Sequence, residues 1–236
     1  MAALVATPAR IPGLDFPLEI KDLQNSRNTY NGLLDDADQP PVAEEHLQKL
    51  AALFVRHNAQ ETLGLHLIHG HFQTSENTVM LGTNFQNPML RWTKVTRVTD
   101  VDLNNIHGHI FVFTGSGFIA YEKEFFVDFV DYLVTNDLTK LLGLQVLMDV
   151  NMTMWELILD QGTVMLDASV VRNCKPTRIT GWRFEAVDGE PRVHESNETH
   201  AAMSSGNHKI FNAGKPLPKL ENVDDLKTSL VNVDVL

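Results

Sequence analysis

The chain has 236 residues, 43% of them hydrophobic, and its 30 acidic and 19 basic residues give it a formal net charge of −11. This length and composition suit one globular domain with a real core and argue against a disordered protein. A field of this sign repels phosphate backbones and anionic membrane surfaces. We therefore expect neither nucleic acid nor a membrane among its partners.

The single cysteine, Cys174, excludes an intramolecular disulfide and a metal cage built of cysteines. Such cysteine usage is typical of a reducing compartment. The first residues lack the basic segment of a secretory signal, and no apolar stretch approaches the length of a membrane span. We therefore expect a cytoplasmic protein.

Prolines and turn-forming residues punctuate residues 1–40, which predicts an irregular N-terminal arm. A first helix is predicted over 41–57, because apolar residues recur from Leu47 at i, i+3, i+4 and i+7. The strand-like segments that follow are close together and separated by turn residues, which indicates antiparallel pairing. These predicted strands are 63–72, 77–82, 91–98, 107–113 and 117–122.

A second helix is predicted over 124–142, with a break near Asn136, a good cap residue. Two hairpin turns are expected after it, at Gln161-Gly162 and at Asp188-Gly189. The predicted strands of this half are 144–149, 154–160, 163–171, 178–187 and 191–194. The polar residues 195–236 predict a second irregular arm.

Together these segments predict an α+β fold. A curved antiparallel sheet, which could bend into a barrel, packs against two main helices. A single α+β domain over 41–194 is expected between the arms 1–40 and 195–236. A strongly bent sheet leaves a cavity at its mouth or between sheet and helix, and we place the functional site there.

Two His-Gly-His triplets are the most distinctive feature of the sequence, with His69 and His71 in one and His107 and His109 in the other. Side chains alternate between the two faces of a strand. The two histidines of each triplet should therefore share a face, while His66 should point to the opposite side. If the two strands are neighbours, four imidazoles could converge, and these four histidines are our candidate catalytic residues.

Imidazole-rich sites suit transition metals, and zinc or iron is the metal we expect if one is bound. Carboxylates that could complete such a site are Glu76 and Glu122. The predicted metal ligands are accordingly His69, His71, Glu76 and Glu122. The predicted substrate-binding wall consists of apolar and aromatic side chains, namely Phe111, Phe113, Trp92 and Trp155.

The segment GLHLIHGHFQTSENTVMLG resembles the first metal motif of the cupins. His69, His71 and Glu76 stand at its HxHxxxxE spacing, and the resemblance implies that these three residues bind the metal. The second cupin motif, which supplies the last histidine, has no match in the chain. The segment LHLIHGHF, with a WRF strand and a later HKIF, is also similar to a group of uncharacterised fungal proteins, which implies a cytosolic protein of specialised metabolism.

Three functions remain open at this point. The first is an enzyme for a small, largely apolar molecule, of the isomerase, lyase or cyclase type, with histidines as acid and base or as metal ligands. The second is a non-catalytic protein that binds a small ligand in the same cavity. The third is a structural protein whose histidines lie in the core and whose arms make a homo-oligomer.

Overall fold

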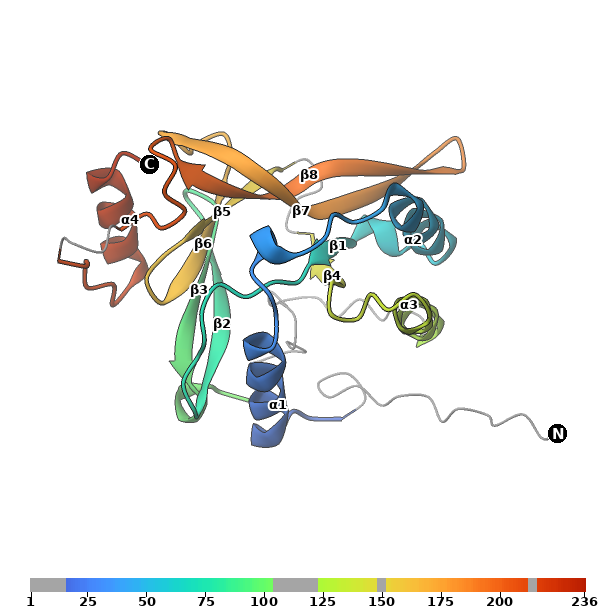
Figure 1. The fold of residues 1–236 in the computed structure, drawn as a ribbon, viewed down its shortest axis with the longest axis horizontal. Coiled ribbons are helices and arrows are strands. Elements are labelled where there is room, and N and C mark those ends of the chain that lie inside the picture. The colour runs from blue at the N-terminus through green and yellow to red at the C-terminus, as the bar shows by residue number, and fades with distance from the viewer. Residues whose placement is uncertain (1–15, 104–122, 148–151, 212–215) are drawn as a thin grey trace.

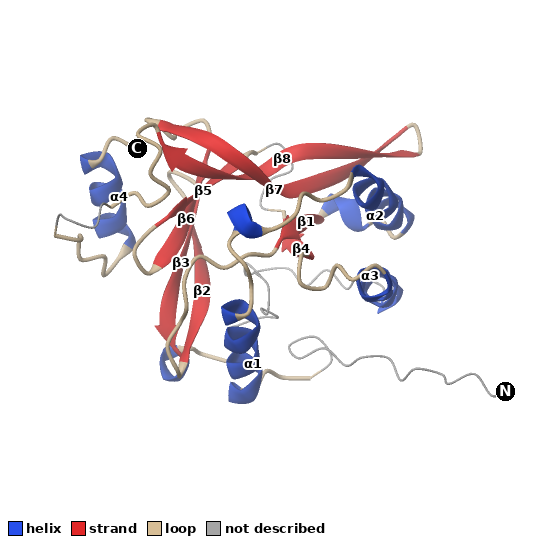
Figure 2. Cartoon of the chain, in the orientation of Figure 1, coloured by secondary structure: helices blue, strands red, loops and turns tan. Residues whose placement is uncertain are grey.

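The computed structural model describes residues 16–103, 123–147, 152–211 and 216–236, without the side chains of 123 and 195–197. They form an α+β fold in which one strongly curled sheet makes a half-barrel (Figure 1, Figure 2). The helices are α1 (Ile20–Asn31), α2 (Glu44–Arg56), α3 (Lys123–Thr135) and α4 (Val223–Asn232). The strands are β1 (Leu63–Leu67), β2 (Thr78–Phe85), β3 (Leu90–Arg97), β4 (Leu142–Val146), β5 (Met154–Ile158), β6 (Gly162–Asp167), β7 (Cys174–Val187) and β8 (Glu190–Met203).

The eight strands lie in the order β2-β3-β6-β5-β8-β7-β1-β4. Six of the seven neighbouring pairs are antiparallel, as expected, but β5 and β8 are parallel, so the sheet is mixed. The expected antiparallel pairing therefore holds everywhere in the described sheet except at the β5–β8 pair. Turn residues reveal hairpins between consecutive strands, but they carry no information on how β8 returns to the distant β5.

The turn between β7 and β8 falls where the sequence placed it. Asp188 and Gly189 have φ values of 55° and 83°, and Val187 pairs with Glu190 on either side of them. Positive φ at both central residues matches the right-handed twist of the strands, which explains the Asp-Gly pair. The predicted hairpin between β5 and β6 is also confirmed, although its turn lies one residue earlier than Gln161-Gly162: the N–H of Leu159 donates to the carbonyl of Gly162, which is the first residue of β6.

Two apolar clusters cover the sheet on its outer side. The first lies under α2 and α3, where Leu50, Phe54 and Phe125 are fully buried together with Leu65 and Leu67 of β1. The predicted apolar stripe of α2 is therefore confirmed. The second cluster packs α4 against β3, β5 and β6. Figure 1 shows the corresponding arrangement, with α2 and α3 beside β1 and β4 and α4 beside β5 and β6.

The prediction of two irregular arms is wrong, because each arm contains a helix. In α1 the carboxylate of Asp22 accepts a hydrogen bond from the backbone N–H of Glu19, 2.8 Å away, and so caps the first turn. This helix is polar, so its sequence shows no apolar stripe. In the C-terminal part, Asn222 caps α4 by accepting from the N–H groups of Asp224 and Asp225 at 2.9 and 3.0 Å.

Strand β8 also extends to Met203, well beyond the predicted end at residue 194. This extension carries Glu198 and His200 into the sheet. Within the described ranges, no helix combines the length and the apolar character that a bilayer crossing requires.

Candidate functional site

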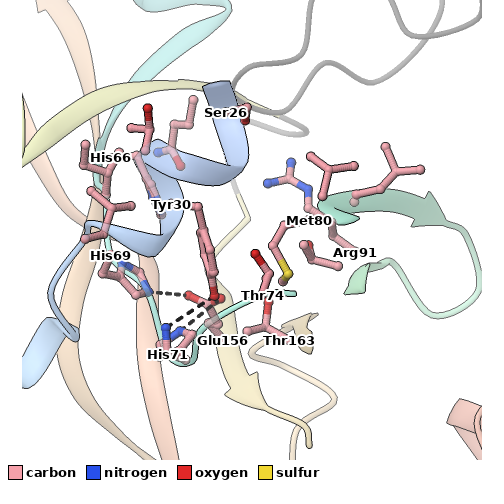
Figure 3. A pocket seen from close by; sticks show the side chains of 18 of the residues that line it. Ser26, Tyr30, His66, His69, His71, Thr74, Met80, Arg91, Glu156 and Thr163 are labelled. Carbon is pink, nitrogen blue, oxygen red and sulfur yellow. Dashed lines mark hydrogen bonds and ion pairs between the residues drawn. The ribbon is translucent and has the colours of Figure 1, made fainter. Parts of the chain in front are cut away.

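A cavity of about 200 Å³ lies between the sheet, helix α1 and the segment 68–74 that follows β1. Every strand except β7 contributes to its lining. Most of the wall is apolar, with Leu23, Ile68, Val79 and Leu144 among its residues, and a group of histidines and carboxylates occupies one side (Figure 3).

The strand register places four side chains in one row, and three of them, Arg91, Met165 and Glu156, line the cavity. Arg91 of β3 pairs with Met165 of β6, Met165 pairs with Glu156 of β5, and Glu156 pairs with His200 of β8. Residues directly opposite each other on neighbouring strands project from the same face. Since neighbouring strands lie about 4.8 Å apart, the backbones of Arg91 and Glu156 are separated by about 10 Å.

His66 enters the cavity through a gap left by a glycine. It pairs with Gly181 of β7, and Gly181 in turn pairs with Glu198 of β8. Because Gly181 has no side chain, Nδ1 of His66 reaches across to lie 2.9 Å from Oε2 of Glu198. A Cβ added at position 181 would lie 2.7 Å from the Cβ of Glu198, so the close approach requires glycine.

His69 and His71 lie beyond the end of β1, not on a strand. The predicted strand 63–72 ends at Leu67, so the assignment of faces by alternation is wrong from residue 68 onward. His66 points toward the same cavity as His69, and the centroids of their rings are 5.6 Å apart. The neighbours Leu65 and Leu67 face the α2–α3 core instead.

The segment 68–74 is held in place by the chain that follows α1. The side-chain amide of Gln39 donates to the carbonyl of Ile68 at 2.7 Å, and the N–H of Gly70 donates to the carbonyl of Leu34 at 3.0 Å. At the far end, Oδ1 of Asn31 accepts from both the backbone N–H and the hydroxyl of Thr74, at 2.8 and 2.9 Å. The part of the chain predicted as an arm thus fixes the histidine segment.

His69 and Glu156 form a buried pair at the cavity wall. Nδ1 of His69 donates to the carbonyl of Leu67 at 2.7 Å, and Nε2 lies 3.1 Å from Oε2 of Glu156. Burial disfavours the imidazolium, but the charge and hydrogen bond of Glu156 outweigh it and raise the pKa of His69 to about 9. Burial likewise opposes ionisation of Glu156, yet His69 and His71 hold the pKa of that carboxyl well below its usual value. Both shifts favour an imidazolium next to a carboxylate at neutral pH.

His71 lies between two carboxylate groups. Its Nε2 is 3.7 Å from Oε1 of Glu156, and its Nδ1 is 3.4 Å from Oδ2 of Asp35. Beyond it, His200 is 1% exposed, and its Nδ1 lies 2.9 Å from Oδ2 of Asp36. Burial acts against the ionised form of Asp36, but the adjacent His200 lowers its pKa overall.

Two overlapping groups of these residues could hold a metal ion. One consists of His69, His71 and Glu156, and the other of Asp36, His71 and His200; within each group the ligand atoms lie within 4.8 Å of one another. Two histidines and a carboxylate with open positions are a known donor set for iron and zinc. The hydrogen bond from Nδ1 of His69 to Leu67 would orient Nε2 for such a role.

Two further polar side chains face the cavity. Tyr30 of α1 points its hydroxyl toward His71 and Glu156, and burial raises the pKa of this phenol, so it stays neutral and able to donate (Figure 3). On the other side, Arg91 of β3 is 4% exposed and directs its guanidinium into the cavity (Figure 3).

The structure brings only part of the predicted site together. His69 and His71 lie in the cavity wall, whereas Glu76 is exposed and belongs to neither metal-capable group. Trp92 and Trp155 pack in the α4 cluster and do not line the cavity. The remaining predicted residues, His107, His109, Phe111, Phe113 and Glu122, lie outside the described residues.

Several polar side chains at the site were not predicted from the sequence. Glu156 offered a signal, since it is a lone carboxylate in the apolar segment MWELIL. His200 and Glu198 lay in a presumed arm, and Tyr30 and Asp36 in the other arm. The register of distant strands places Glu156, Glu198 and His200 at the site. Tyr30 lies on α1, and Asp36 lies in the short 3-10 helix that follows it.

Comparison of the chain with models of protein families, with curated proteins and with solved structures finds no significant match. The resemblances to the cupin motif and to the fungal proteins therefore stay predictions.

Proposed function

We propose that the protein is a small-molecule enzyme that transfers protons on a largely apolar substrate, as an isomerase, lyase or cyclase does. The observation that carries this proposal is the buried His69–Glu156 pair on the wall of an apolar cavity. A cavity of this kind with a few convergent polar groups is the usual form of a small-molecule site.

The pair supplies an acid and a base side by side. The carboxylate of Glu156 can accept a proton from a substrate carbon, while Nε2–H of His69 donates to the oxygen on which negative charge develops. Environments that push the pKa values of two neighbouring groups apart allow each to keep its own role at neutral pH. The neutral hydroxyl of Tyr30 could donate a further hydrogen bond to the same oxygen. Return of the proton at another carbon would complete an isomerisation.

Deuterium exchange tests this proposal without knowledge of the natural substrate. A panel of small apolar ketones with acidic C–H bonds is incubated with the protein in D₂O, and label at the α-carbon is measured by mass spectrometry. We expect exchange that His69→Gln and Glu156→Gln each reduce at least about 100-fold. Exchange at the same rate in these variants would contradict the proposal.

The chain offers a matched control in a second His–Glu pair. His194 and Glu185 contact each other on the β7–β8 hairpin, where their side chains are 37% and 38% exposed. His194→Gln removes a histidine of the same pairing type away from the cavity. The exchange rate should stay at the wild-type value in this variant.

A second candidate is metal-assisted chemistry in the same cavity, favoured by the two metal-capable groups. Since His71 belongs to both, His71→Ala should abolish binding of a zinc or iron ion by either group. Elemental analysis of the untagged protein would show near-stoichiometric metal in the wild type and in His194→Ala, and none in His71→Ala. A wild-type protein without metal after growth in supplemented medium would contradict this candidate.

We further infer a cytoplasmic location, on the ground that a chain with one cysteine suits a reducing compartment. Fractionation of cells that express the full chain tests this, and recovery in a secreted or membrane fraction would contradict it.

A further inference from the structure

Arg91 lies in the cavity wall with part of its hydrogen-bonding capacity unused. Its Nε donates to Oδ1 of Asn84 at 3.1 Å, and its Nη1 donates to the sulfur of Met165, a weak acceptor, at 3.8 Å. Nη2 is buried and has no hydrogen-bond partner among the described residues. Since the residue is 4% exposed, bulk water does not reach these donors freely.

The nearest carboxylate satisfies this guanidinium incompletely. Oε1 of Glu198 is 3.6 Å from Nη1 of Arg91, longer than a hydrogen bond, and its other oxygen lies 2.9 Å from Nδ1 of His66. Buried donors without partners cost free energy, so a site of this kind gains from any ligand that supplies acceptors. The planar guanidinium fork matches a carboxylate, which can accept two parallel hydrogen bonds.

The buried positive charge of Arg91 contrasts with the negative net charge of the whole chain. With a formal net charge of −11, the protein does not attract anions in general. A buried arginine that faces an apolar cavity is therefore a specific feature of this site. The cavity also limits the ligand, because its volume of about 200 Å³ admits only a small molecule.

We propose that the cavity binds a small apolar carboxylic acid, whose carboxylate accepts hydrogen bonds from Arg91 and whose apolar body lies against Leu23, Val79 and Leu144. Arg91 and Glu156 stand in one row of the sheet, two strands apart. A carboxylate held at Arg91 thus directs the opposite end of the molecule toward Glu156 and His69. This inference rests on the proposed function only in assigning the same cavity to the substrate.

Binding of matched acids and amides by isothermal titration calorimetry tests the inference. Benzoate, phenylacetate and 3-phenylpropionate are each compared with their primary amide, which has nearly the same shape and no charge. We expect at least one acid to bind the wild-type protein about 10- to 100-fold more tightly than its amide. If no acid in this panel binds more tightly than its amide, the inference is overturned.

Variants assign the preference to Arg91. Arg91→Met should abolish it, and Arg91→Lys, which keeps the charge but loses the fork, should retain only a small part of it. If Arg91→Met does not fold, Arg91→Lys decides, and an undiminished preference in that variant would overturn the inference. Arg97→Met, at the exposed end of the same strand, is the matched control and should keep the full preference.

The binding measurement and the isotope-exchange measurement test the carboxylate site and the proposed function separately. Acid preference without isotope exchange in any panel compound would leave Arg91 as an anion site and contradict proton transfer. Isotope exchange on the ketones, without tighter binding of any acid than of its amide, would support proton transfer and contradict the carboxylate site at Arg91.

Discussion

Nε2 of His69 lies 3.1 Å from Oε2 of Glu156, although the two residues are 87 positions apart and both side chains are buried. Removing one member of a buried ion pair leaves the other charge uncompensated, which costs about 3–5 kcal/mol. We expect His69→Gln and Glu156→Gln each to lower the free energy of unfolding by about this amount. The double variant should lose much less than the sum of the two.

Urea unfolding of the four proteins measures this coupling. The exposed pair His194–Glu185 is the control, and its single variants should cost less than about 1 kcal/mol. Additive effects at His69 and Glu156 would show that the two groups do not form an ion pair.

The pair also predicts how stability depends on pH. The pKa of His69 is raised from 6.5 to about 9, so its stabilisation is complete below about pH 6.5 and is lost as the pH rises through about 9. The pKa of Glu156 is lowered, so its contribution is complete above its ordinary value of 4.5 and is lost only as the pH falls well below that value.

For the alkaline side, a shift from 6.5 to about 9 corresponds to about 3 kcal/mol. The stability advantage of the wild type over His69→Gln should therefore fall by about this amount between pH 6 and pH 10. An advantage that stays constant over this range would contradict a charged His69.

A side chain at position 181 should disturb the cavity wall at Glu198. Because its added Cβ would lie 2.7 Å from the Cβ of Glu198, Gly181→Ala should displace Glu198 and separate it from His66. We expect a loss of about 1–3 kcal/mol in the free energy of unfolding. Gly32→Ala is the control, since Gly32 has φ of −93° and its Cβ would have no contact closer than 3.4 Å. Equal stabilities of the two variants would contradict this account of His66.

Asn31 should hold the histidine segment 69–74 in position. Its side chain makes three hydrogen bonds to Thr74, two as acceptor and one as donor to the carbonyl at 2.9 Å, and so ties the histidine segment to α1. Asn31→Ala should speed amide hydrogen exchange across 69–74 and lower the deuterium-exchange rate on the ketone panel. Asn25→Ala, on an exposed position of the same helix, should change neither. Unchanged protection of 69–74 in Asn31→Ala would contradict the anchoring role.

The local elements were predictable because their signals are local. The apolar stripe of α2 and the Asp188-Gly189 turn each follow from a few neighbouring residues, and both are confirmed. The α+β fold with a curled sheet could be predicted from the number and spacing of the strand-like segments.

The site was predictable only in part. The triplet of His69 and His71 pointed to the right segment. Beyond the end of β1 at Leu67, however, that segment is held by the side-chain amide of Gln39, which donates to Ile68, and by the carbonyl of Leu34, which accepts from Gly70, and no local pattern reveals these tertiary bonds. Helix α1 is polar in sequence, and half of its residues are exposed, so it gave no periodic apolar signal. Glu156 and His200 meet through the parallel β5–β8 pairing, a contact between segments more than 40 residues apart.

The most direct test of the His69–Glu156 pair is ¹⁵N NMR of the imidazole rings in metal-free protein, with His69 assigned by comparison with His69→Gln. We predict that both ring nitrogens of His69 carry protons at pH 7.5, with deprotonation only near pH 9, and that Glu156→Gln shifts this titration toward the ordinary histidine range. A neutral His69 at pH 7.5 in the wild-type protein would contradict the proposed acid–base pair.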